Sequence, residues 1–440
     1  MSISTTVPLF QFPASTQAFN QTAAKPASLP VPNPTRSFWI DSTPDANPLA
    51  AEGSEGPFTE DADICIVGSG ITGVSAAYHI ARCVERGEIP RTDNDKALRV
   101  VILEARDFWH LTPLVFIDFT SYQEKYGQEQ AVRCLNLETH TASEIVKLIR
   151  QEGWSEAVDL VENGHTTLFF TPEEYDAVKA DFVAAQEAGL DVSSVRWLSK
   201  EDTKDKYGAA YPAVEFGGHN LWPLKFVTQL YLLAKNKTSS QFNLKLHTRT
   251  PVTSISLSSK SSISSSSSSR RWAVTTPRGT LDCSHIIHAT NAYASHLLPH
   301  LSGPAGIVPA RGQVVALRAN VVADKMFKCS WDGNQGFEYW FPRPVELQGA
   351  ADLNDKSDEN LKENLKKPLV ILGGGREVEG SGFEFGETDD SVLNVEVGKM
   401  LRGFLPAVFP GKFDAGQEPE MEWTGIMGFT KLGDPFVRRL

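Results

Sequence analysis

The stretch Asp61-Ala-Asp-Ile-Cys-Ile-Val-Gly-Ser-Gly-Ile-Thr-Gly73 decides the fold. Its apolar run Ile64–Val67 is typical of a strand buried in a parallel sheet, and the glycines that follow match the pattern G-x-G-x-x-G. Helix-forming residues continue over Val74–Val84, and Leu98–Leu103 is a second apolar strand. Strand, helix and strand in this order predict a βαβ unit and therefore an α/β fold.

Each glycine of the pattern has a physical task in binding a dinucleotide. Gly68 permits the tight turn, Gly70 lets the backbone approach a pyrophosphate, and Gly73 lets the helix pack closely on the strand. The free amides at the start of the helix favour the phosphates. Glu104 ends the second strand, where an acidic side chain can accept hydrogen bonds from ribose hydroxyls. Glu104 lies farther along the chain from the glycines than is usual for the motif, and a polar insertion at 85–97 accounts for the extra residues. The alternative is that the segment is a glycine-rich turn that binds no nucleotide.

Composition limits the classes of function. The chain has 440 residues, of which 41% are apolar and 22% charged, as in soluble globular proteins of two or three domains. A formal net charge of −12 without a basic block argues against nucleic-acid binding. No apolar run reaches the length of a bilayer, and the N-terminus lacks a basic segment before an apolar one. These features predict a cytoplasmic protein that binds neither nucleic acid nor membrane.

Five scattered cysteines without a CxxC pair indicate reduced thiols, and no His/Asp/Glu cluster has the spacing of metal ligands. Residues 1–58 are rich in Pro, Ser, Thr and Asn and predict an extended, mostly irregular arm. Within the arm, residues 36–40 form an aromatic island that we expect to anchor it on the main body. The serine tract at 258–269 lies between two strand patterns and predicts a hairpin extension.

Further motifs follow in a fixed order: DADICIVGSGITGVSAAYHIA, VVILEARD, PVTSI, HIIHATNAYASHLLP, PARGQVVAL, VILGGGRE and EWTGIMGF. From about residue 35 to the C-terminus, this set resembles the D-amino-acid-oxidase-like FAD-dependent oxidoreductases. Within them it resembles fungal and bacterial members similar to gamma-glutamylputrescine oxidoreductase. An NAD-dependent dehydrogenase would share the βαβ unit but would leave the turn at 288–294 and the later motifs unexplained.

The resemblance implies FAD as the cofactor and two interleaved domains. A Rossmann-like FAD-binding domain is expected from residues 59–145, 217–300 and 420–440. An α+β substrate domain with an antiparallel sheet is expected from 146–216 and 301–419. The residues that match the family's FAD cradle are Gly68, Ser69, Gly70, Thr72, Gly73, Glu104, Ala105, Arg106, Val252, Ala289, Thr290 and Asn291.

The resemblance also implies a chemistry: oxidation of a C–N bond of a small-molecule amine or amino acid to an imine, with dioxygen as the electron acceptor. No residue stands out as an acid–base catalyst. Tyr339 and Trp340 are candidates for the substrate pocket, with sheet packing as an equal alternative. Arg376 could reach an anionic group of the substrate, but a solvated charge at a strand end is the commoner state of an arginine.

Met427 stands near the position where the amino-acid-oxidising relatives carry an arginine that binds the substrate carboxylate through two parallel hydrogen bonds. A thioether cannot bind a carboxylate, so the residue favours a longer amine as the substrate. The alternative is that Met427 packs in the core and that Arg376 or Arg311 binds the carboxylate from another strand.

The chain departs from the family pattern in two places. After Leu103-Glu-Ala-Arg-Asp107 the family has a Gly/Ser/Ala-rich turn beside the flavin ring, whereas here the chain runs on to Phe108-Trp-His-Leu111. The family also continues past the last motif, whereas this sequence ends at Leu440. The alternative function is therefore a truncated or catalytically defective flavoprotein-like protein that lacks the loop beside the flavin ring.

Overall fold

The computed structural model describes residues 12–43, 45–89, 97–105, 113–259, 270–345, 366–378 and 380–437. The strands of these residues are β1 Asp61–Val67, β2 Leu98–Leu103, β3 His165–Leu168, β4 Arg196–Leu198, β5 Ala213–Phe216, β6 Phe242–His247, β7 Ser254–Leu257, β8 Trp272–Thr276, β9 Gly279–His288, β10 Ile307–Arg318, β11 Ser330–Gly333, β12 Glu338–Pro342, β13 Leu369–Gly374 and β14 Met421–Thr430. The α-helices are α1 Phe12–Gln21, α2 Phe38–Asp41, α3 Ile71–Glu85, α4 Phe119–Tyr126, α5 Gln128–Gln151, α6 Pro172–Glu187, α7 Lys200–Tyr207, α8 Pro223–Asn236, α9 Ala294–Leu297 and α12 Val395–Val408. Short 3-10 turns are η2 Asn291–Tyr293, η3 Pro299–Leu301, η4 Ala323–Lys325 and η5 Gly382–Glu384.

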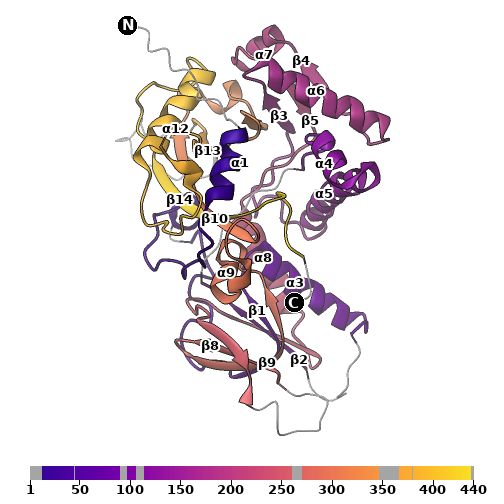
Figure 1. Ribbon diagram of the computed structural model, residues 1–440, viewed down its shortest axis with the longest axis vertical. Coiled ribbons are helices and arrows are strands. Elements are labelled where there is room, and N and C mark those ends of the chain that lie inside the picture. The colour runs from indigo at the N-terminus through magenta and orange to yellow at the C-terminus, as the bar shows by residue number, and fades with distance from the viewer. Residues whose placement is uncertain are drawn as a thin grey trace, which may run out of the picture.

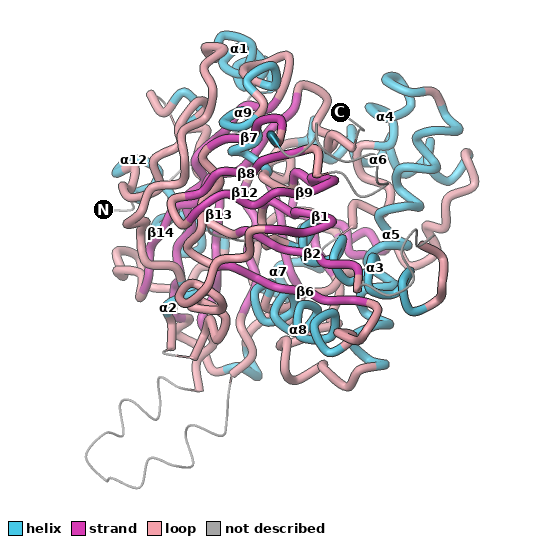
Figure 2. The backbone as a smooth tube through the Cα atoms, turned by 90° about the horizontal axis from the view of Figure 1, so that it is seen from below, coloured by secondary structure: helices cyan, strands magenta, loops and turns pink. Residues whose placement is uncertain are grey.

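A six-stranded sheet in the order β6-β2-β1-β9-β8-β7 forms one lobe of the molecule, the lower one in Figure 1. Strands β6, β2, β1 and β9 run parallel, and β7, β8 and β9 form an antiparallel meander. Helices α3 and α8 pack on the sheet with the apolar residues of β1, β2 and β6. In Figure 2 the six strands lie side by side in this order. The βαβ unit expected from the sequence is therefore confirmed.

An eight-stranded sheet in the order β14-β10-β13-β12-β11-β3-β5-β4 forms the second layer. All its neighbouring strands are antiparallel except β11 and β3. Helix α12 covers one face, where Trp340, Leu372 and Leu401 are buried in a common core. The other face contributes Phe341 and Trp423 to a cluster with residues near α2 and α8. The second face therefore looks toward the lobe of the six-stranded sheet.

Segments of the two sheets alternate along the chain. The last strand lies in the eight-stranded sheet. Residues 420–440 are expected in the FAD-binding domain, but β14 pairs with β10 from Met421↔Ala316 to Thr430↔Ile307. The strand Met421–Thr430 thus belongs to the eight-stranded sheet.

The N-terminal arm is more ordered than its composition predicts, because it contains the ten-residue helix α1. The aromatic anchor is confirmed: Trp39 is 8% exposed and stacks on Phe341, with ring centroids 6.1 Å apart. Arg343 lies over Trp39 and over Trp222, which caps α8. The arm therefore bridges both lobes. No helix among the described residues combines the length and the apolar character needed to cross a bilayer.

Candidate active site

The parallel strands of the six-stranded sheet end at one edge. Val67 pairs with Leu103 and with His288, and Leu103 pairs with His247, so the carboxyl ends of four strands are level. Strand β1 lies between β2 and β9. The strands that follow it in the chain first extend the sheet on one side, as β2 and β6, and then on the other, as β9, so the strand order reverses at β1. In open α/β sheets, ligands bind in the crevice outside such a reversal of strand order. The segments that follow β1, β2 and β9 are the GSGITG turn, Glu104 and the Ala289–Asn291 turn.

The turn after β1 is too tight for any residue but glycine at two positions. Gly68 has φ +108°, and an added Cβ would collide with the carbonyl oxygen of Ala289. A Cβ on Gly73 would collide with the carbonyl oxygen of Gly68. Gly70 precedes α3, and no side chain caps the helix. The first amides of α3 therefore remain available for an anion. Ser69 is half-buried and Thr72 is exposed beside this turn.

Glu104 and Val252 lie along the same edge. The Glu104 amide donates to the carbonyl of His247 at 3.1 Å, and the Glu104 carbonyl accepts from Thr250 at 3.0 Å. Val252 is 4% exposed, and none of the described residues forms a hydrogen bond with its backbone. Its amide and carbonyl are thus free for a planar ring such as adenine. Ala105 is exposed, and Arg106 lies outside the described residues, as does the segment where the family has its Gly-rich turn.

The turn after β9 carries buried polar atoms without partners. The Ala289 amide donates to the Val67 carbonyl at 2.9 Å, which fixes the start of the turn. Thr290 Oγ1 and His288 Nδ1 are buried, and neither has a hydrogen-bond partner among the described residues. Burial lowers the pKa of His288. Asn291, which has φ +44°, lies against Gly428 of β14 and connects this turn to the second sheet.

The face of the eight-stranded sheet that looks toward the six-stranded sheet is lined with glycine. Cross-strand partners share a face, and Gly312↔Gly425 and Tyr339↔Gly373 are such pairs. A Cβ on Gly373 would overlap the Tyr339 ring, and a Cβ on Gly312 would lie 2.7 Å from Met427 Cε. The Tyr339 ring therefore covers Gly373, and the Met427 side chain covers Gly312, on this face.

Trp340 occupies the other face of β12 and is fully buried. It stacks on Trp331 at 5.9 Å between ring centroids and packs against α12 residues. Of the two aromatic candidates, the structure thus favours sheet packing for Trp340 and places Tyr339 on the glycine-bearing face. Successive side chains of a strand point to opposite faces of the sheet, so Tyr339 and Trp340 lie on different faces although the sequence offers both as candidates.

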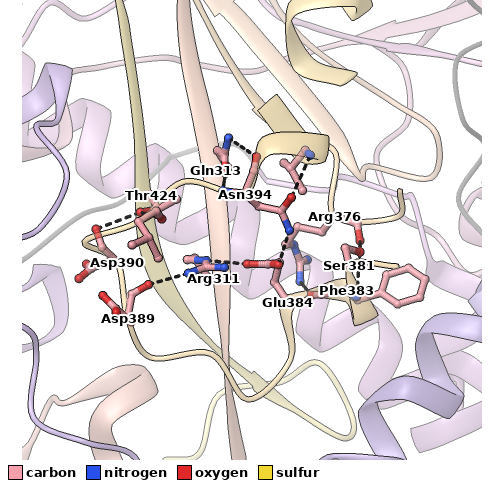
Figure 3. Close-up of polar contacts among 12 residues, drawn as sticks. Arg311, Gln313, Arg376, Ser381, Phe383, Glu384, Asp389, Asp390, Asn394 and Thr424 are labelled. Carbon is pink, nitrogen blue, oxygen red and sulfur yellow. Dashed lines mark hydrogen bonds and ion pairs between the residues drawn. The ribbon is translucent and has the colours of Figure 1, made fainter. Parts of the chain in front are cut away.

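The two arginine candidates lie in different surroundings (Figure 3). Arg311 donates to Glu384 at 2.5 Å and to the Asp389 carbonyl at 2.9 Å, so it already has a counter-ion. Arg376 is 8% exposed and donates to the Phe383 carbonyl at 3.1 Å. The interpretation of Arg376 as a solvated strand-end charge is therefore wrong, because the turn after β13 folds it beneath the rings of residues distant in sequence. Burial lowers its pKa to about 10.

A pair of buried carboxyl groups beside Arg376 escaped the sequence analysis. Glu338 is fully buried and accepts from Asn334 Nδ2 at 2.8 Å and from the Gly375 amide at 3.1 Å. Both oxygens of Glu377 are buried without a donor among the described residues, and its carboxyl group lies against that of Glu338. Burial raises the pKa of both groups. The only hint in the sequence is an acidic residue inside the apolar strand Glu338–Pro342.

A family model described as DAO, FAD dependent oxidoreductase, matches residues 63–440. The chain belongs to this family. Its members are FAD-dependent oxidoreductases, and so is this protein. No curated protein sequence matches the chain.

Solved structures of similar fold include glycine oxidase from Geobacillus kaustophilus, with a TM-score of 0.56 and 18% identity over 86% of this chain and 85% of that one. L-proline dehydrogenase from P. horikoshii has a TM-score of 0.56 and 17% identity, covering 87% of this chain and 86% of that one. L-α-glycerophosphate oxidase from Mycoplasma pneumoniae, solved with FAD bound, has a TM-score of 0.54 and 14% identity over 84% of each chain. At these identities the likeness establishes the fold alone.

The residues at the carboxyl edge fit the FAD of a DAO family member. A side chain at Gly68 or Gly73 would collide with the backbone of Ala289 or Gly68, so these glycines keep the strand-to-helix turn as tight as the dinucleotide motif requires. The unpartnered Thr290 Oγ1 and His288 Nδ1 are polar atoms that a bound cofactor could satisfy. Both observations concern the half of the site that holds the nucleotide.

Proposed function

We propose that the protein oxidises a C–N bond of an amine or amino acid to an imine and passes the electrons to dioxygen. The observation that carries the proposal is the glycine-bearing face of the eight-stranded sheet, where Tyr339 and Met427 lie and which looks toward the six-stranded sheet. When bound, FAD supplies the two-electron oxidation, which is chemistry that belongs to the cofactor. Released imine would hydrolyse in water to a carbonyl compound and an amine or ammonia.

The chain's own residues would orient both molecules. Gly68, Ser69, Gly70, Thr72 and Gly73 would surround the pyrophosphate with backbone amides. Glu104 would accept hydrogen bonds from the ribose, the Val252 backbone would pair with the adenine, and Ala289, Thr290 and Asn291 would border the cofactor nearer the second sheet. Ala105 and Arg106 would lie beside the ribose.

The division into domains follows from the two sheets. We assign the six-stranded sheet with α3 and α8 to an FAD-binding domain, and the eight-stranded sheet with α12 to a substrate domain. The glycine-lined face lies where the two meet, which is where small-molecule sites commonly form. Tyr339 would contact the substrate from β12, and Met427 would contact it from β14.

The substrate subclass follows the family resemblance. Several relatives of similar fold act on small amino acids by their names, among them glycine oxidase and L-proline dehydrogenase. The motif likeness to gamma-glutamylputrescine oxidoreductase supports longer amines as well. Both groups present a C–N bond next to an oxidisable C–H bond, so one substrate panel tests both.

The test is to purify the protein and record its absorbance between 350 and 500 nm, roughly the range in which oxidised flavins absorb. The protein is then mixed without oxygen with glycine, proline, sarcosine, putrescine and a γ-glutamylated amine. We expect bleaching of the flavin band by at least one compound, and hydrogen peroxide on readmission of air. A protein that retains FAD but is reduced by no compound would refute C–N oxidation and support the catalytically defective alternative.

A further inference from the structure

Residues 50–59 of the N-terminal arm form a clasp on the carboxyl end of β6. The Thr248 amide donates to the Glu52 carbonyl at 3.0 Å. Gly53 follows with φ +60°, and a Cβ added to it would lie 2.1 Å from the Leu246 carbonyl oxygen. The arm therefore meets the strand end through backbone atoms, with no room for a side chain between them.

His247, the last residue of β6, joins the two ends of this clasp. It is 4% exposed, with Nδ1 2.9 Å from the Gly53 carbonyl oxygen and Nε2 2.9 Å from the Thr59 hydroxyl. A carbonyl oxygen only accepts, so Nδ1 carries the hydrogen of the neutral ring, and Nε2 accepts from Thr59. Arg278, in the turn between β8 and β9, donates to the same Gly53 carbonyl at 2.5 Å and to the Gly56 carbonyl at 3.2 Å.

The clasp holds the segment that connects the two residues proposed for the adenosine of FAD. The His247 carbonyl accepts from the Glu104 amide at 3.1 Å, and the Glu104 carbonyl accepts from the Thr250 amide at 3.0 Å. Thr250 is fully buried, and Val252 follows two residues later. The backbone of residues 247–250 thus fixes the place of Glu104 and the start of the turn to Val252. The arm is bound to that same backbone.

Protonation of His247 acts against the clasp. The charged ring donates from both nitrogens and places a cation against the Arg278 guanidinium, which donates to the same carbonyl. Burial lowers the pKa of His247 from 6.5, its hydrogen bond to the arm opposes that shift, and Arg278 and Lys245 lower the pKa further. The stability that the neutral ring contributes is therefore complete above pH 6.5 and is lost as pH falls through the folded-state pKa. The other charged groups at the clasp, Lys235 and Glu52, pair with each other at 2.5 Å.

We propose that residues 50–59 are an acid-sensitive clasp that positions Glu104 and Val252 for the adenosine of FAD, with His247 as its joint. A closed clasp holds the loop after β6 in one conformation before FAD binds, which lowers the cost of ordering that loop in the complex. Acid opens the clasp and weakens FAD binding. His247 acts through the backbone of Glu104 and is a positioning residue. The inference rests on the proposed places of Glu104 and Val252, but not on the oxidation of a C–N bond.

Two glycine substitutions in the clasp test the positioning. Gly53→Ala should push the arm off β6, because the new Cβ would collide with the Leu246 carbonyl. Gly56→Ala is the matched control, since Gly56 has φ +78° but no atom of the described residues lies within 4 Å of an added Cβ. Calorimetric titration of the FAD-free protein should give a Kd for FAD about ten-fold higher in Gly53→Ala, the effect of about one hydrogen bond, and within about two-fold of the wild type in Gly56→Ala. ADP carries the adenosine without the flavin, so its Kd should rise by the same factor.

A pH series separates the joint from a purely structural histidine. The wild-type Kd for FAD should rise as pH falls from 7.5 to 5.5. His247→Asn keeps an amide donor near the place of Nδ1 and carries no titratable ring, so its Kd at pH 7.5 should stay within about three-fold of the wild type and should not change with pH. His247→Ala lacks the donor and should bind FAD about ten-fold more weakly at both pH values. His140→Asn, at an exposed position on α5, should keep the wild-type profile.

Hydrogen exchange of the FAD-free protein gives a readout that needs no cofactor. The amides of Thr248 and Thr250 donate to the Glu52 and Glu104 carbonyls. After correction for the intrinsic effect of pH on exchange, both amides should exchange faster in the wild type at pH 5.5 than at pH 7.5. They should also exchange faster in Gly53→Ala than in the wild type, and His247→Ala, which adds no Cβ, carries the same test if Gly53→Ala does not fold.

Four results would overturn the inference: unchanged exchange of the two amides, equal Kd values for FAD in Gly53→Ala and Gly56→Ala, an effect on FAD without one on ADP, or a pH profile in His247→Asn as steep as that of the wild type. The proposed function fails separately. If FAD binding depends on the clasp but no amine or amino acid reduces the flavin, C–N oxidation alone is refuted. If an amine reduces the flavin while Gly53→Ala binds FAD as the wild type does, the clasp alone is refuted.

Discussion

Thr290→Val should stabilise the FAD-free protein and weaken FAD binding at the same time. Valine keeps the shape of threonine and removes only the hydroxyl. Thr290 Oγ1 is buried at the carboxyl edge without a hydrogen-bond partner among the described residues. A buried polar atom without a partner costs about 1–3 kcal/mol, so its removal should return a part of that stability.

The size of the effect follows from the length of the chain. At about 2.1 cal/mol/K per residue, unfolding of 440 residues carries an entropy near 0.9 kcal/mol/K. A gain of about 1–3 kcal/mol then raises the melting temperature of the FAD-free protein by roughly 1–3 °C. The same hydroxyl, once bonded to FAD, contributes about 1–1.5 kcal/mol, so its loss should raise the Kd for FAD by about ten-fold.

Thermal unfolding with and without FAD measures both effects. At a free FAD concentration of about 100 times the wild-type Kd, binding stabilises the wild type by about 2.7 kcal/mol, and a ten-fold weaker variant by about half of that. Thr228→Val is the matched control. Among the described residues, Thr228 Oγ1 is also buried without a partner, but it lies on α8 and not in the turn that follows β9. The variant Thr228→Val should stabilise the protein without changing the FAD-dependent shift of the melting temperature. Equal FAD-dependent shifts in wild type and Thr290→Val would refute the reasoning.

Two further substitutions probe the cradle and the carboxyl pair. Gly70→Val should place a side chain where the pyrophosphate approaches, so the purified variant should lack the flavin band, and retention of FAD with unchanged affinity would contradict the cradle. Glu377→Gln should stabilise the protein at pH 7.5 but not at pH 4. Burial raises the folded-state pKa of Glu377 above its value of 4.5 in the unfolded chain, so the wild type loses stability as pH rises from that value toward the folded pKa. Each pKa unit between the unfolded and the folded value corresponds to about 1.4 kcal/mol of unfolding free energy. The exposed control variant Glu156→Gln should show no gain in the free energy of unfolding measured with urea.

The sequence predicts the cofactor half of the molecule well because local constraints act there. The GSGITG turn needs glycine for its own backbone geometry, and the strands on either side must be apolar along their whole length. A stretch of about a dozen residues is therefore enough to show these requirements. The pairing of the edge strand Met421–Thr430 with β10 is not evident from the sequence, because β10 lies more than a hundred residues away and pairing between distant strands leaves little trace in either.

The substrate half depends on contacts that no local pattern records. Arg376 follows a run of glycines, and exposed arginine is the common case, so the sequence favours a solvated charge. Its burial comes from Phe337, Phe385 and Phe429, which three separate segments bring together. Likewise, Glu338 and Glu377 meet only because β12 and β13 pair in a register that places Tyr339 opposite Gly373.

Unsatisfied polar groups mark both ends of the proposed site, and this has a consequence for stability. Thr290 Oγ1 lies at the carboxyl edge of the six-stranded sheet, and the Arg376 guanidinium lies beside the eight-stranded sheet. Asn291, which lies against Gly428, joins the two sheets between them. Natural proteins bond nearly all buried polar groups, because each one left alone costs free energy. A chain that keeps two such groups at one interface therefore has a ligand-free state less stable than its core alone would allow. Ligands that satisfy them bind only the folded state and should restore that stability by mass action.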